Sequence, residues 1–148
     1  MDRFQKDPVA YEGDFVLWIE AQVEALRDHR FEELDIDNLL EELESIVRHQ
    51  CRELRSRLQV IIMHLLKCEY QAHLRGDSWH STLNTQRSDI EILLEDSPSL
   101  APLVLPFAEK EYRRAVRKAV RETRLPPKAF PPDLPYTREQ LLDFDYLP

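Results

Sequence analysis

Hydrophobic residues recur at three- and four-residue spacing along most of the chain, which is the period of an α-helix. The first such stretch predicts a helix over residues 14–30, with the short carboxylate of Asp14 as its N-cap. Phe15 and Trp18 widen its apolar stripe, and both are expected to anchor the core, as is Trp79 further along. The stripe itself consists of Val16, Ile19, Val23 and Leu26.

A second and longer stretch of helical spacing covers residues 37–70, and Gln50 interrupts its apolar stripe. Because a helix of that length is unusual in a small domain, we expect a break at 47–51 that gives two helices. The segment 71–77 predicts a loop, and Ser78 is the expected cap of a helix that reaches residue 94. The next helix is expected to start at Ser97-Pro98, to be kinked by Pro106 and to end near Arg124.

Prolines divide the chain, since residues 9–97 contain none and residues 125–135 contain five. The second segment predicts an extended arm, followed by a short helix that opens at Thr137 with Gln140 completing a capping box. No run of alternating polar and apolar residues persists, and two glycines are too few for many tight turns. We therefore predict an all-α fold, a compact bundle of about five helices. It would form a single domain over 1–148, with a flexible N-terminus at 1–12 and an arm at 125–148 that packs on the bundle.

Charge is distributed unevenly around a net value of −8. Residues 1–48 hold 14 acids and 5 bases, a net of −9, whereas residues 98–128 hold 8 bases and 3 acids, a net of +5. The overall negative charge opposes non-specific binding to nucleic acid or to an anionic membrane. The two regions are expected either to face each other or to present separate patches to partners.

The remaining composition predicts a reduced, cytoplasmic protein. Cys51 and Cys68 are too few for a disulfide scaffold, and they do not form a Cys-x-x-Cys pair. The first 13 residues have no apolar core typical of a secretory signal, and no apolar run approaches the ~18 residues that a membrane span needs.

A series of short motifs resembles a known family. They are Tyr11-x-x-Asp14-Phe15-x-x-Trp18, Leu34-Asp35, Leu39-x-Glu41-Glu42, Ser56-x-Leu58, His64-Leu65-Leu66-Lys67, Ser78-Trp79-x-x-Thr82, Gln86-Arg87, Ser97-Pro98-Ser99-Leu100, Glu122-Thr123, Phe130-Pro131, Pro135-x-Thr137-x-x-Gln140-x-Leu142-Asp143 and Leu147-Pro148. Their order and spacing resemble the bacterial domain-of-unknown-function family numbered 29, from Tyr11 to Pro148. The resemblance implies an all-helical fold and leaves the function open. The chain departs from the family at Cys68, where tryptophan is frequent, and near Val47 and Arg124, where glycine is usual.

Two residues offer a candidate catalytic pair. Arg57 and His64 are seven positions apart and therefore share a helix face. This spacing fits the loose pattern of the all-helical "higher eukaryotes and prokaryotes nucleotide-binding" ribonucleases, in which the histidine acts as acid or base and the arginine stabilises the phosphate. The competing interpretation, which we favour, makes His64 a buried polar residue bonded to a neighbouring helix.

Metal and cofactor chemistry finds little support in the sequence. The chain contains no Glu-x-x-His motif, which a carboxylate-bridged metal centre in a helix bundle requires. His64 with Cys68 and two His–Glu pairs are one turn apart, but zinc needs three or four ligands. We predict no metal and no cofactor.

A basic helix face is the strongest candidate for binding. Its cations recur mostly every three or four residues, opposite a side that carries Ala108, Tyr112, Ala115 and Ala119. The face comprises Lys110, Arg113, Arg114, Arg117, Lys118 and Arg121. It can contact an acidic partner or nucleic acid, pair with the acidic segment 31–47, or be a solvated surface. We predict a non-enzymatic protein-interaction or regulatory module with an unidentified protein partner. The alternatives are a metal-independent ribonuclease or a nucleic-acid-binding regulator, and self-association is left open.

Overall fold

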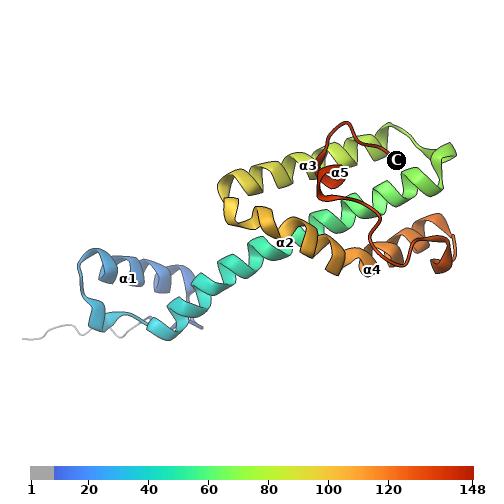
Figure 1. Ribbon diagram of the computed structural model, residues 1–148. Helices are drawn as coiled ribbons and strands as arrows, with labels where there is room; N and C mark the ends of the chain where they lie inside the picture. The colour runs from blue at the N-terminus through green and yellow to red at the C-terminus, as the bar shows by residue number, and fades with distance from the viewer. Residues whose placement is uncertain (1–8) are drawn as a thin grey trace, which may run out of the picture. The chain divides into compact units, whose positions relative to one another are not determined.

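Every regular element among residues 9–148, the part that the computed structural model describes, is a helix (Figure 1). The α-helices are α1 (Phe15–Arg27), α2 (Ile36–Tyr70), α3 (Asp77–Asp96), α4 (Val104–Thr123) and α5 (Arg138–Leu142). Short 3-10 helices lie between them: η1 (Phe31–Glu33), η2 (Ala72–Leu74), η3 (Pro98–Leu103) and η4 (Pro127–Ala129). The predicted all-α class is confirmed, and the residues group into two compact units, 9–48 and 49–148.

The first unit is held together by hydrogen bonds around a buried tryptophan. Trp18 Nε1 donates to Asp35 Oδ2 at 3.0 Å, and the Tyr11 ring lies 4.8 Å from the Trp18 ring, centroid to centroid. The Tyr11 hydroxyl donates to Glu42 on α2. Asp14 caps α1 as predicted, because its carboxylate accepts the amide of Leu17. Most of the N-terminus expected to be flexible, residues 1–8, lies outside the described residues.

The buried face of α1 differs from the apolar stripe in its sequence. The buried residues are Trp18, Gln22 and Ala25, whereas Val16, Val23 and Leu26 are exposed. Phe15 is exposed too, so the expectation that it anchors the core is wrong. Hydrogen bonds select this face: the Gln22 side chain accepts the backbone amide of Asp35 at 2.7 Å, beside the bond from Trp18. Two directional bonds to one turn orient α1 more strictly than non-directional burial does.

The predicted break at 47–51 is absent, and α2 is one helix of 35 residues. The segment contains neither glycine nor proline, so no residue in it disfavours helical backbone strongly. Gln50, which interrupts the apolar stripe, lies within the helix, and its side chain accepts a hydrogen bond from the Ser97 hydroxyl at 2.9 Å. Arg48 adds ion pairs to Glu41 and Glu44 on the preceding turns.

The second unit is built around the C-terminal half of α2, whose residues 61–68 are all buried. Burial on every side of a helix requires neighbours all round it. These neighbours are α3 (through Leu83 and Ile90), α4 (through Ala108 and Ala115) and the C-terminal arm, which share one hydrophobic core (Figure 1). Trp79 is half-buried at its edge, where the Lys67 ammonium lies 4.4 Å from its ring centroid.

The arm is joined to this core by apolar and polar contacts. Phe130, Tyr136 and Leu141 are buried in the core cluster, and Leu142 and Leu147 pack against it. The Arg87 side chain, 1% exposed, donates to three arm carbonyls: those of Leu141 at 3.0 Å, Gln140 at 3.0 Å and Tyr146 at 3.2 Å. The capping box of Thr137 and Gln140 is present as predicted.

Two helix starts differ from the sequence prediction. Helix α3 begins at Asp77 with Gly76 as its N-cap, so Ser78 is inside the helix rather than before it. Residues 98–103 form η3, and α4 begins only at Val104. Pro106 is therefore the third residue of α4, a position where the missing amide has no partner within the helix, so it removes no helical hydrogen bond.

Candidate binding face on helix α4

Helix α4 separates small buried residues from long exposed cations. Ala108, Ala115 and Ala119 are fully buried, which brings the α4 backbone close to the core. The six predicted cations and Arg124 are all exposed. Arg114 pairs with Glu111 at 3.0 Å, and the other cations of the face form no ion pair among residues 9–148. The face therefore presents an uncompensated positive charge.

One buried carboxylate fixes the rotation of α4. Glu111 is 0% exposed and accepts hydrogen bonds from Arg55 and Gln59 on α2, as well as from Arg114. Burial by itself raises the pKa of Glu111, but these hydrogen bonds outweigh it and lower the pKa below the usual 4.5. Glu111 is thus a carboxylate at neutral pH, and its contacts with α2 point the basic residues away from the core.

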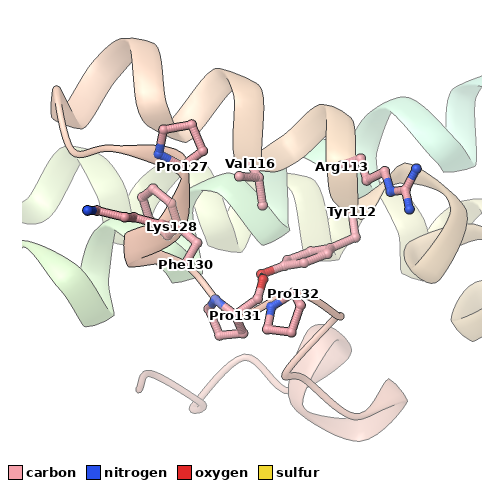
Figure 2. Close-up of a pocket in the computed structure, with 8 residues that line it drawn as sticks. All are labelled: Tyr112, Arg113, Val116, Pro127, Lys128, Phe130, Pro131 and Pro132. Carbon is pink, nitrogen blue, oxygen red and sulfur yellow. The ribbon is translucent and has the colours of Figure 1, made fainter.

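A pocket of about 410 Å³ adjoins the basic face (Figure 2). One wall comes from α4 and carries Tyr112, Arg113 and Val116, and the other comes from the arm. The arm residues are Pro127, Lys128, Phe130, Pro131 and Pro132. In the view of Figure 2, the charged ends of Arg113 and Lys128 lie at opposite ends of the pocket. The site thus combines an apolar lining with a cation at either end.

The pocket wall is stabilised by an internal hydrogen bond. Tyr112 is 3% exposed, and its hydroxyl donates to the Pro131 carbonyl at 2.7 Å. Burial raises the pKa of Tyr112 to about 12, so the hydroxyl keeps its proton at physiological pH. Three prolines with restricted backbone add to this rigidity. Because the pocket walls are already ordered, little conformational entropy is lost when an apolar side chain enters.

Arg57 and His64 are engaged in contacts of their own. The Arg57 guanidinium pairs with Glu53 at 2.9 Å and with Asp89 at 2.6 Å. The ring of His64 is buried, and its Nδ1 bonds the Val60 carbonyl at 2.9 Å, so its partner is its own helix rather than a neighbouring one. Burial lowers the pKa of His64, which favours the neutral ring. Neither residue lines the pocket.

The described part of the chain contains no group of three or more His, Cys, Asp and Glu side chains arranged to hold a metal ion. Of the two thiols, Cys68 is buried and Cys51 is half-buried. Burial raises the pKa of Cys68, which disfavours the reactive thiolate. Within residues 9–148, no helix is both long enough and apolar enough to cross a membrane.

The sequence indicated half of this site. The helical spacing alone identified the cations of α4. The pocket also depends on residues 127–132, and the sequence analysis predicted for that arm only that it packs on the bundle. The available signal was the cluster of prolines around Phe130 and Lys128, directly after the basic helix. The sequence analysis gave no role to Arg87, which donates hydrogen bonds to the arm. Arginines in amphipathic helices are mostly exposed, so the sequence does not distinguish a buried one.

Fold and site together define an all-helical protein with an exposed basic face beside a proline-lined pocket. The family model described as "Domain of unknown function DUF29" matches residues 10–147. The chain therefore belongs to this family. No curated protein and no solved structure matches it.

Proposed function

We propose that this protein is a non-enzymatic interaction module that binds an acidic segment of a partner protein through α4. The carrying observation is the row of exposed cations without ion pairs next to an apolar pocket. Carboxylates of the partner would contact Arg113, Arg117 and Arg121, whose guanidinium groups suit bidentate pairing. An aromatic or aliphatic side chain of the same segment would enter the pocket. On this proposal the protein acts in a bacterial cytoplasm.

A protein segment fits this site better than nucleic acid does. Tyr112, the aromatic residue among these cations, is buried and bonded to Pro131, so it offers no free face for base stacking. A pocket lined by prolines and Phe130 instead suits a single apolar side chain from a short segment.

The test is a binding titration with designed peptides. The probe is a fluorescein-labelled 15-residue peptide rich in Asp and Glu with one central Trp, and its control replaces the Trp by Ser. We expect micromolar binding of the Trp peptide, weaker binding of the Ser peptide, and loss of affinity as salt rises. Equal affinity for the two peptides would contradict a role for the pocket.

Matched charge reversals assign the binding to α4. Arg117→Glu with Arg121→Glu should weaken the binding of the Trp peptide about 10-fold or more. Arg27→Glu with Arg52→Glu changes the net charge equally at two exposed positions outside the face and should leave most of the affinity. If both double variants lose the same affinity, the attraction is diffuse and the proposed site is wrong. Tighter binding of a single-stranded RNA than of the peptide would favour the nucleic-acid regulator.

The ribonuclease alternative has its own test. With Arg57 paired to two carboxylates and His64 bonded to Val60, we expect no RNA cleavage by the purified protein. Cleavage that His64→Ala abolishes, in a variant as stable as the wild type, would establish the enzyme instead.

A further inference from the structure

The first unit, residues 9–48, carries an apolar surface that the proposed function does not use. Large hydrophobic side chains that are exposed, between 42% and 64%, gather on its two helices and their connection. They are Phe15, Val16, Leu17, Val23, Leu26, Phe31, Ile36, Leu40, Leu43, Ile46 and Val47. Monomeric proteins expose such residues singly, whereas a contiguous set is typical of an interaction site.

These side chains form two stripes with the spacing of helix–helix contacts. On α1 the exposed residues Val16, Val23 and Leu26 share one side of the helix with the half-buried Ile19. On α2 it is Ile36, Leu40, Leu43 and Val47, separated by four, three and four. Alternating steps of three and four residues place side chains along one side of a helix, where a partner helix can pack against it. Each stripe spans at least ten residues, enough for a partner helix of about three turns.

Charge around the stripes indicates the chemistry of that helix. Residues 9–48 contain 12 acids and 3 bases, a net of −9. Several exposed acids lie directly beside stripe residues: Glu20 follows Ile19, Asp37 follows Ile36, and Glu44 follows Leu43. Acidic flanks on an apolar seam attract cations at the corresponding flanks of a partner helix. Two copies of this unit would bring −9 against −9, which opposes pairing of the unit with itself.

We infer that the apolar stripe of α2 binds a basic amphipathic helix of another protein. Its apolar face lies along Leu40 and Leu43, and its Lys and Arg side chains pair with Asp37 and Glu44. This site takes a partner of opposite charge to the partner of α4. The protein then joins an acidic segment and a basic helix through separate surfaces.

The experiment uses the full chain and a designed peptide. The probe is a labelled 20-residue Leu/Lys peptide with leucines at helical three- and four-residue spacing, and the control is its scrambled sequence with the same composition and charge. We expect 1:1 binding of the probe by fluorescence anisotropy and analytical ultracentrifugation, with at least 10-fold weaker binding of the scrambled peptide. Equal binding of both, or binding of neither, overturns the inference.

A matched pair of variants places the site. Leu40→Ser with Leu43→Ser changes two exposed side chains, so the fold should remain, which circular dichroism checks. This variant should bind the probe at least 10-fold more weakly than the wild type does. Leu74→Ser with Ile92→Ser, at equally exposed positions in the second unit, should change the affinity less than twofold. Equal loss in both variants overturns the inference. It is also overturned by a concentration-dependent dimer that only Leu40→Ser with Leu43→Ser dissolves, because a second copy is then the occupant.

Discussion

The two units use apolar residues in opposite ways, although α2 runs through both. In residues 49–148 the apolar side chains of α2 are enclosed by α3, α4 and the arm, and the cations of the α4 face are exposed. In residues 9–48 the helices α1 and α2 bury mainly Trp18 and Ala25 and leave most of their large apolar residues exposed. Two helices alone can bury only one face each, whereas a third and fourth neighbour close a core. We therefore expect the second unit to supply most of the stability, and the first unit is the one to which our inference assigns a helical partner.

The largest expected effect is the loss of the arm from the second unit. Truncation after Arg124 removes Phe130, Tyr136 and Leu141 from the core, each contributing about 1.5–3 kcal/mol when fully buried. It also removes the three carbonyl acceptors that tie the Arg87 guanidinium to the arm. We expect a loss of roughly 5 kcal/mol or more in the free energy of unfolding, measured by urea denaturation. An unchanged urea midpoint would show that the arm serves only a partner.

Two leucines of α2, one in each unit, test directly whether the first unit is packed less completely than the second. Leu58 in α2 is 0% exposed, and Leu43, 15 residues earlier in the same helix, is 60% exposed. Leu58→Ala should cost about 2–5 kcal/mol, because it leaves a cavity in the core. Leu43→Ala should change stability by no more than about 0.5 kcal/mol, as at other surface sites. Similar losses for the two variants, read from the same thermal melts, would mean that the first unit is as fully packed as the second.

We expect His64 to make the stability of the second unit depend on pH. Its pKa is lower in the folded state than the usual 6.5, because burial disfavours the charged ring. The unfolded chain therefore binds the proton first, so the free energy of unfolding falls as the pH drops below 6.5 and stops falling below the folded pKa. His64→Ala should cost about 1–3 kcal/mol at pH 7 and should flatten this part of the profile. Urea titrations of the wild type and the variant between pH 5 and 7.5 measure the loss of stability and its pH dependence. If the free energy of unfolding falls equally steeply with decreasing pH in the variant, His64 is not the cause.

The lowered pKa of Glu111 acts in a separate range. Its contribution is present above about 4.5 and is lost as the pH falls through the lower folded value, so it leaves the His64 window unchanged.

The smallest expected effects are at the two helix ends with left-handed backbone. Arg124 ends α4 at φ 63°, and His29 follows α1 at φ 57°, conformations that glycine adopts without a steric penalty. Arg124→Gly should raise the free energy of unfolding by about 0.5 kcal/mol, since the relief of strain exceeds the entropy that glycine adds to the unfolded chain. His29→Gly should leave the main melting transition unchanged if the first unit melts separately. A shift of the main transition by His29→Gly would show that the two units unfold together.

Local chemistry determined much of this protein from sequence alone. The helical period, the Asp14 cap, the capping box at Thr137 and the proline-rich arm each depend on residues within a few positions of one another. The left-handed backbone at Arg124 was not predicted, although the glycine that is usual near that position in the family adopts such a conformation readily.

Tertiary structure decided what depends on residues far apart in the chain. The buried face of α1 depends on Asp35, which forms hydrogen bonds with Trp18 and Gln22. In α2, Gln50 contacts Ser97, which is 47 residues further along the chain. The pocket required the arm to return to α4, where Tyr112 bonds Pro131. Hydrophobic spacing states which residues prefer burial, but burial is non-directional, so directional hydrogen bonds between distant residues chose which of them are covered and which remain exposed.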